Sequence, residues 1–245
     1  MGQNREAEQM EALEAFIDDA TIDEVVGTIK SGKEATVYCC YSTRHDGLVA
    51  AKVYRSHNVR QFANDASYTG GRLRRHNRYE RAIAQKSRAG RQFAFSAWVN
   101  AEYETLETLH RAGGDVPRPI ARSESIIIME YIGDEDAPAP MLSSVDFDDV
   151  TAREAFGQIM RNVELALSHD RIHGDLSPHN VLYHEGRVCV IDFPQAVDPR
   201  FNPNALELLG RDIENVCRFA ERHRVTVDAG RITRELWGRF LRAEL

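Results

Sequence analysis

Two short stretches in the last third of the chain hold the residues best suited to chemistry. Residues 173 to 182 read HGDLSPHNVL, and VIDFPQ begins at Val190. A carboxylate such as Asp175 can orient and deprotonate an attacking hydroxyl or water. The oxygens of Asn180 and Asp192 would converge from the two sides of a hairpin and hold Mg²⁺ against nucleotide phosphates. The types and spacing of these residues therefore predict a phosphoryl-transfer site.

This spacing is the catalytic arrangement of protein-kinase-like folds, in which an Asn follows the acidic residue by five positions and an Asp follows the next hairpin. Such a fold requires a phosphate-binding lysine on a strand, and Lys52 fits that position. It also requires a glutamate on the next helix to pair with that lysine. Glu102 is the best candidate, because Leu106 and Leu109 share its helical face, whereas Glu104 lies off that face.

A glycine-containing stretch near the N-terminus, GTIKSGKEATVY from Gly27 to Tyr38, begins like a Walker A phosphate loop. Glu34, however, replaces the hydroxyl residue that would bind magnesium there. An extended run of β-branched and aromatic residues follows, whereas a Walker loop leads into a helix. A plain hairpin turn explains this stretch by itself. Together with Lys52 and Glu102, we interpret SGKEATVY as a β-hairpin that covers phosphates.

Hydrophobic periodicity predicts the elements that must position these residues. Strands are predicted over Val25–Ile29, Ala35–Tyr41, Leu48–Tyr54 and Ser125–Ile132, with a short hairpin from Val181–Tyr183 and Arg187–Ile191. Helices are predicted over Ser96–Ala112 and residues 147–169, 205–222 and 229–243, with helical character also around Tyr79–Lys86. We therefore expect an α+β, bilobal protein-kinase-like fold, with an antiparallel sheet plus a helix in the N-lobe and a mainly helical C-lobe.

The expected domains are an acidic helical leader at 1–24, an N-lobe at 25–132 and a C-lobe at 133–245. The N-lobe would contain a basic mobile loop at 55–97. The leader is rich in Ala, Glu and Met, which is consistent with an exposed helix or a frayed segment. GDEDAPAP, at 133–140, lacks periodicity and is the predicted connector between the lobes.

With 245 residues, of which 42% are hydrophobic, the chain can build a substantial core. Apolar runs such as Ile126–Met129 are far too short to span a membrane, and the N-terminus lacks a signal-peptide arrangement. We therefore expect a cytoplasmic protein without membrane contacts. The four cysteines show neither metal-ligand spacing nor a disulfide framework, so we interpret them as reduced packing residues.

Charge is distributed unevenly along the chain, whose net charge is −7. The segment Arg55–Arg91 contains ten Lys or Arg and only two acids, Asp65 and Glu80, so it carries +8 and the remainder carries −15. A solvated loop would explain this segment. The sharper hypothesis is an anionic partner such as RNA or a nucleotide.

Several motifs together resemble the RIO family of atypical protein kinases and ATPases. They are SGKEATVY, WVNAEYETL (98–106), MEYIGDEDAPAP (129–140), HGDLSPHNVLY (173–183), IDFPQAV (191–197) and ELLGRDIENV (207–216). The likeness covers roughly Thr28 to Ala220. HGDLSPHN alone is also similar to aminoglycoside and choline phosphotransferases. The first 24 residues leave no room for the winged helix typical of one subfamily, so we expect the subfamily without it, although the DFPQ spelling is also seen in the other.

The resemblance implies a role for each matched residue. Ser31 and Lys33 would contact the triphosphate, and Lys52 would pair with Glu102. Glu130 and Ile132 would offer backbone groups to adenine. Asp175 would be the catalytic Asp, and Asn180 and Asp192 would bind metal. The implied cofactors are ATP and Mg²⁺, with Mn²⁺ as an alternative metal. The implied partners are a protein substrate or the chain itself, and RNA or a ribosomal particle through the basic loop 55–91.

Three departures from ordinary protein kinases are visible. No Ala-Pro-Glu follows Asp192, and only about twenty residues separate it from Arg211-Asp212, too few for an activation segment with a peptide platform. Pro194 replaces the glycine of Asp-Phe-Gly, which should make this loop less able to flip. Ser177 stands where a basic residue usually lies, so we expect the basic loop to supply the missing charge. The candidates there are Arg72, Arg74 and Arg75.

We therefore expect a Mg-ATP-dependent kinase that phosphorylates protein serine or itself. The resemblance adds ATP hydrolysis through an aspartyl phosphate, for which Asp192 is the implied acceptor. A small-molecule phosphotransferase is the alternative enzyme, favoured by His173-Gly174-Asp175 and disfavoured by SGKEATVY. A protein that uses nucleotide as a switch in ribonucleoprotein assembly is the alternative from another class.

Overall fold

The computed structural model describes residues 2–55 and 88–245. The described chain forms two compact units, which are treated separately below. The first unit contains residues 2–55, 88–103 and 118–131, and the second contains residues 104–117 and 132–245. The domain boundaries drawn from the sequence stay a prediction. The centre of the basic segment and the helical stretch expected around Tyr79–Lys86 lie outside the described residues.

A five-stranded antiparallel sheet forms the first unit. Its strands are β1 (Glu24–Ser31), β2 (Ala35–Ser42), β3 (Gly47–Tyr54), β4 (Pro119–Arg122) and β5 (Ile126–Glu130). They lie in the order β1-β2-β3-β5-β4, so β3 is the central strand. The predicted antiparallel sheet is confirmed, and Pro119 lies on an edge strand, where its missing N–H costs no ladder bond.

The two middle strands, β3 and β5, consist mainly of β-branched and small apolar residues, and both of their faces are largely buried. Ile126, Ile127 and Ile128 are fully buried, and all but the first two residues of β3 are buried. The turn between β2 and β3 passes through Asp46 and Gly47, both with positive φ. These two residue types tolerate the left-handed region, so the turn fixes the register that places Lys52 on the buried strand.

The segment expected to be a helical leader forms helix α1 (Gly2–Asp18), and most of its described side chains are exposed. Its Leu13 and Phe16 are buried in the hydrophobic core that the sheet forms. Gln9 also accepts a hydrogen bond from the Tyr38 hydroxyl (2.9 Å) and donates one to Thr36 Oγ1 (3.2 Å). Although the segment is acidic overall, it contains a short apolar stripe, and this stripe is enough to pack one side of the helix against the sheet.

Helix α5 (Arg88–Arg111) begins eight residues before the helix predicted from Ser96, within the segment expected to be a loop. Aromatic packing accounts for the earlier start, because Phe95 and Trp98 both lie against the ring of Tyr54, at centroid distances of 6.5 and 4.8 Å. The helix ends at two glycines, as predicted. Gly113 has φ +84°, and the Gly114 N–H donates to the Leu109 carbonyl (2.9 Å).

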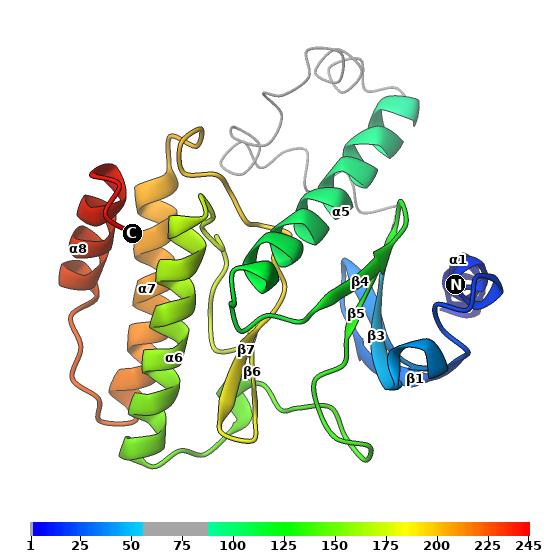
Figure 1. The fold of residues 1–245 in the computed structure, drawn as a ribbon, viewed down its shortest axis with the longest axis horizontal. Helices are drawn as coiled ribbons and strands as arrows, with labels where there is room; N and C mark the ends of the chain where they lie inside the picture. The colour runs from blue at the N-terminus through cyan, green and yellow to red at the C-terminus, as the bar shows by residue number, and fades with distance from the viewer. Residues whose placement is uncertain (1, 56–87) are drawn as a thin grey trace. The chain divides into compact units, whose positions relative to one another are not determined.

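The second unit is mainly helical, as predicted. Helices α6 (Asp149–Ser168), α7 (Ala205–Arg222) and α8 (Ala229–Leu241) lie side by side (Figure 1). A two-stranded hairpin, β6 (Val181–His184) and β7 (Arg187–Val190), packs against α6. Its turn runs through Glu185 and Gly186, which both have positive φ, the backbone of a type I′ turn. Two 3₁₀ turns, Thr43–His45 and Leu142–Ser144, complete the described elements.

All four cysteines are free thiols. Burial raises the pKa of Cys40 to about 12 and the pKa of Cys217 to about 11. Both thiols are therefore protonated at neutral pH and act as packing groups. Among the described helices, none combines the length and hydropathy that crossing a bilayer requires.

Candidate active site

The first unit brings Lys52 and Glu102 together. Lys52 Nζ lies 2.7 Å from Glu102 Oε1, and the two side chains are 9% and 1% exposed. The Tyr54 hydroxyl donates to the other carboxylate oxygen of Glu102, and its ring lies 5.1 Å from the Lys52 ammonium. A buried carboxylate with two donors holds the lysine in one position. The pairing partner is thus Glu102, not Glu104.

The turn between β1 and β2 carries Ser31 and Lys33, which are both exposed. The Gly32 N–H closes the turn by donating to the Ala35 carbonyl (2.9 Å). Arg55, at the end of β3, donates to Ser31 Oγ (2.8 Å) and to Thr36 Oγ1 (3.1 Å). This arginine was not among the residues expected at the hairpin. Its side chain adds hydrogen bonds to the pairing of β2 with β3, which runs from Ala35 opposite Tyr54 to Ser42 opposite Gly47.

The two residues expected to meet adenine have main-chain partners. The Glu130 N–H donates to the Arg118 carbonyl, and the Ile132 carbonyl accepts from the Ala139 N–H, both at 2.9 Å. The roles expected for these two residues toward adenine stay predictions.

The second unit brings together the three residues of the carboxylate-and-amide motif. Asn180 Nδ2 donates to the main-chain carbonyl of Asp175 (2.8 Å), and the Asn180 carbonyl accepts from the Ile191 N–H (3.0 Å). Asn180 and Asp192 therefore sit at the base of the same hairpin. Asp175 is exposed to solvent. Asp192 has φ +71°, a backbone conformation that costs energy in a non-glycine residue and is concentrated at functional sites.

His173 links the two loops. Its Nε2 lies 3.1 Å from the Ile191 carbonyl, and its Nδ1 lies 3.3 Å from the Asp175 N–H. Because the Ile191 carbonyl can only accept, Nε2 carries a proton and donates it in this hydrogen bond. The ring also packs on Phe193, with centroids 4.6 Å apart. One buried side chain thus fixes the main chain beside both carboxylates.

Helix α7 anchors the catalytic loop from behind. Asp212, 2% exposed, accepts from the N–H groups of Gly174 (2.7 Å) and Leu176 (2.9 Å), which flank Asp175. Asn215 donates to the Leu176 carbonyl (3.0 Å), and Arg211 donates to the Gly174 carbonyl. Sequence reasoning gave these three helical residues no role.

The sequence did contain a signal for the anchor. Asp212 lies one turn from the buried Leu208 and Leu209 and beside the buried Ile213, so a charge occupies the apolar face of an amphipathic helix. A charge in that position requires partners, which here are the two main-chain N–H groups.

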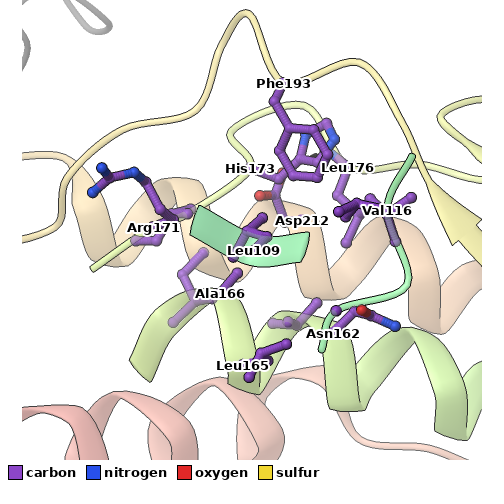
Figure 2. A pocket seen from close by; sticks show the side chains of 15 residues that line it. Leu109, Val116, Asn162, Leu165, Ala166, Arg171, His173, Leu176, Phe193 and Asp212 are labelled. Carbon is purple, nitrogen blue, oxygen red and sulfur yellow. Dashed lines mark hydrogen bonds between the residues drawn. The ribbon is translucent and has the colours of Figure 1, made fainter. Parts of the chain in front are cut away.

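A cavity of about 30 Å³ lies behind this loop, as Figure 2 shows. Its walls are mostly apolar and include Leu109, Val116, Ala166 and Phe193. His173 and Asp212 are the polar groups that face it together with Arg171 and Asn162. Burial raises the pKa of Asp212, even though His173 and the two N–H groups favour its charged form. Hydrogen bonds to this carboxylate are strong because solvent is excluded.

Residues 193–204 connect the Asp192 loop to α7 without regular secondary structure. Arg200 closes this segment through a two-point contact with Asp198, with one nitrogen–oxygen distance of 2.6 Å, and a 2.7 Å contact with Asp170. The pKa of Asp198 is lowered by these hydrogen bonds despite its partial burial. The segment is short and internally bonded, in agreement with the missing activation segment.

The residues at the hairpin base fit Mg²⁺. Among the described residues, no cluster of three or more His, Cys, Asp or Glu side chains offers a complete protein cage for a metal. Mg²⁺ commonly takes only one or two protein oxygens and completes its shell with substrate phosphates and water. The Asp192 carboxylate and the Asn180 amide oxygen provide such a pair, since the Asn180 amide nitrogen is committed to the Asp175 carbonyl.

Comparisons with known proteins agree on one family. The family model described as RIO domain matches residues 36–232. The RIO-type serine/threonine-protein kinase Rio1 of Haloferax volcanii is 35% identical over 237 residues, which cover 91% of this chain and 77% of that protein. Human serine/threonine-protein kinase RIO1 is 34% identical over 207 residues, which cover 84% of this chain and 35% of that protein.

A solved structure supports the fold. It is the Rio2 kinase–ADP/Mg²⁺–phosphoaspartate complex from Chaetomium thermophilum, which is similar to this chain with a TM-score of 0.65 at 19% identity. The match covers 95% of this chain and 72% of that chain. At this identity the likeness speaks for the kinase-like fold alone. The matched domain and the sequence relatives together show that the chain belongs to the RIO family of atypical kinases.

Proposed function

We propose that the chain is a RIO-type kinase that transfers the γ-phosphoryl group of Mg-ATP to a serine hydroxyl, on a protein substrate or on itself. The observation that carries the proposal is the catalytic loop of the second unit. There an exposed Asp175 is flanked by main-chain groups fixed by His173, Asn180 and Asp212. A carboxylate free to meet solvent on a loop held from behind suits a group that must receive a hydroxyl proton.

In this proposal each residue has one task. Asn180 and Asp192 hold Mg²⁺, which when bound draws negative charge from the β- and γ-phosphates. Lys52, fixed by Glu102, binds the phosphates as a cation. Ser31 and Lys33 contact the triphosphate from the hairpin, and the Glu130 carbonyl and the Ile132 N–H bind adenine. Asp175 accepts the proton of the serine Oγ as the bond to the γ-phosphorus forms and the bond to the β,γ-bridging oxygen breaks.

A second chemistry at the same site is ATP hydrolysis through an aspartyl phosphate on Asp192. Two observations favour it: the strained backbone of Asp192 and the phosphoaspartate named in the similar Rio2 complex. The Asp192 carboxylate would attack the γ-phosphorus with loss of ADP, and water would then cleave the acyl phosphate.

Incubation with γ-labelled ATP and Mg²⁺ tests both reactions. Acid-stable label that is lost in Asp175→Ala would support the serine kinase. Hydroxylamine-labile label that is lost in Asp192→Asn would support the aspartyl phosphate. Asp149→Asn, an exposed carboxylate in the first turn of α6, serves as the control and should leave both unchanged. Folded protein that binds ATP but yields neither label nor ADP would contradict the proposal.

The partner and location are proposals as well. We propose a cytoplasmic enzyme that meets RNA or a ribosomal particle through its basic segment 55–91, whose centre lies outside the described residues. Retention of RNA by the intact chain should be lost when Arg72, Arg74 and Arg75 are replaced by alanine. Activity of the same variant on ATP tests whether those arginines also neutralise phosphate.

A further inference from the structure

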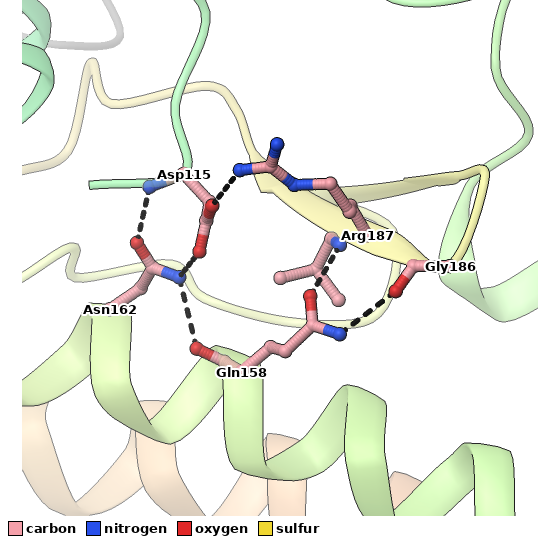
Figure 3. Close-up of polar contacts among 6 residues, drawn as sticks. Asp115, Gln158, Asn162, Gly186 and Arg187 are labelled. Carbon is pink, nitrogen blue, oxygen red and sulfur yellow. Dashed lines mark hydrogen bonds and ion pairs between the residues drawn. The ribbon is translucent and has the colours of Figure 1, made fainter. Parts of the chain in front are cut away.

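A polar network joins three segments of the second unit around Asp115 (Figure 3). The Asp115 N–H donates to Asn162 Oδ1 (2.7 Å), and Asn162 Nδ2 donates back to Asp115 Oδ2 (2.8 Å) and to the Gln158 carbonyl (2.9 Å). Asn162 is 9% exposed and lies on the buried face of α6. Both amide protons and the amide oxygen are used, so this polar group is fully satisfied in an otherwise apolar setting.

The same network holds one edge of strand β7. The Val190 N–H donates to the Asp115 carbonyl (2.7 Å), and the Val188 N–H donates to Gln158 Oε1 (2.9 Å). Gln158 Nε2 donates to the Gly186 carbonyl (2.9 Å). Gly186, Val188 and Val190 are alternate residues, so their main-chain groups face the same side of the strand. The network therefore pairs the edge of β7 that β6 leaves open.

This pairing has a consequence at the base of the hairpin. A two-stranded hairpin is marginally stable by itself, and its register is free to slip without further support. Val181 pairs with Val190, and the next main-chain contact joins Asn180 to Ile191, directly before Asp192. A small shift of β7 would therefore move Asp192 relative to Asn180.

We propose that Asp115, Asn162 and Gln158 are positioning residues for the magnesium site, because they fix β7 and with it the separation of Asn180 and Asp192. The inference rests on the proposed function, in which those two residues hold the metal. It assigns a task to a loop and a helix whose contacts described above reach β7 and its turn.

The network contains its own control. Arg187 also contacts Asp115, at 3.2 Å, but its side chain is 78% exposed. An exposed ion pair of this kind contributes little, since solvent and salt screen it. Arg187→Ala should therefore leave the metal site unchanged, although it removes a contact to the same carboxylate.

The test measures binding of Mn²⁺ in the presence of ADP by calorimetry or electron paramagnetic resonance, alongside the KM for Mg²⁺, kcat and the melting temperature. Gln158→Ala removes both side-chain bonds to β7 and its turn and should weaken Mn²⁺ binding about 10-fold, the lower end of the loss seen when outer-shell partners of metal sites are removed. Asp115→Ala keeps the main-chain carbonyl that accepts from Val190 and removes the side-chain contact to Asn162, so it should weaken Mn²⁺ binding less. The KM for Mg²⁺ should rise in parallel, and saturating Mg²⁺ should restore most of kcat. Gln158→Glu, which keeps the acceptor for Val188, should recover part of the loss.

Two outcomes would overturn the proposal while the proposed function stands. One is a lower melting temperature with unchanged Mn²⁺ affinity in both alanine variants; the other is an equal loss of Mn²⁺ affinity in Arg187→Ala. Asp192→Asn tests the metal-ligand assignment separately from the role of the network. If it leaves Mn²⁺ binding intact, the metal-ligand assignment itself is wrong, whatever the network variants show.

Discussion

The catalytic loop of the second unit and the glycine hairpin of the first are held in different ways. The loop around Asp175 is bonded through its main chain to buried side chains, chiefly Asp212 and His173. The turn of the hairpin around Ser31 is exposed, and Arg55 donates a hydrogen bond to Ser31 Oγ there. The difference indicates that the position of the catalytic loop depends on buried groups, whereas the exposed turn of the hairpin depends less on them.

The largest expected effect is at the buried anchor. Asp212→Ala leaves two main-chain N–H groups without an acceptor, which should cost about 3 kcal/mol in the free energy of unfolding. Displacement of the loop by about 1 Å should lower kcat about 100-fold. Urea denaturation and steady-state kinetics measure both effects. Asn215→Ala, which removes one donor to the Leu176 carbonyl, should give a smaller loss of both; equal losses would contradict the primary role of the carboxylate.

The next largest effect is expected at Gly174, where a side chain would clash with the main chain. Gly174 has φ +81°, and a Cβ there would lie 2.6 Å from the Gln195 carbonyl oxygen. Gly174→Ala should therefore cost about 2 kcal/mol and lower kcat about 10-fold. Gly186 is a matched control, because its φ of +80° is nearly the same and no atom lies within 4 Å of its Cβ position. Gly186→Ala should cost only about 1 kcal/mol and leave kcat unchanged.

Substitutions in the hairpin between β1 and β2 should change substrate binding more than stability. Ser31→Ala and Arg55→Ala should raise the KM for ATP about 3-fold, while the free energy of unfolding changes by less than about 1 kcal/mol, since the lost contacts are superficial. Arg231→Ala, an exposed arginine on α8, controls for loss of surface charge. A fall in stability comparable to that of Asp212→Ala would remove the contrast between the two regions.

The smallest effect is a dependence on pH. Burial raises the pKa of Asp212 above its ordinary value of 3.8, so the folded chain retains this proton at a pH where the unfolded chain has lost it. Stability from this group therefore falls as pH rises from 3.8 through the raised pKa, and the cost persists at neutral pH. Asp212→Asn lacks this titration. The stability of the natural chain relative to Asp212→Asn should thus decline in urea denaturation as pH rises above about 4, and a constant difference would contradict a raised pKa.

Much of the fold was predictable because local patterns and tertiary packing agree. The strands and the last helices follow from alternation, helical spacing and glycine turns, and Lys52, Glu102, Asp175, Asn180 and Asp192 follow from motif spacing. The early start of α5 and the docking of α1 could not be predicted, because both depend on contacts with Tyr54 and with the sheet core. Asp212 was visible as a charge on an apolar helical face, but only the structure identifies its two acceptor bonds.

The segment between Asp192 and α7 has a consequence for how this kinase is regulated. Residues 193–204 read FPQAVDPRFNPN, without a single serine, threonine or tyrosine. Ordinary protein kinases are switched on by adding phosphate to the corresponding segment. In residues 193–204 no side-chain hydroxyl is present to accept a phosphate. Arg200, the arginine of this segment, already forms ion pairs with Asp198 and Asp170. Phosphate transfer to a hydroxyl within residues 193–204 is therefore excluded as a way to switch this chain on.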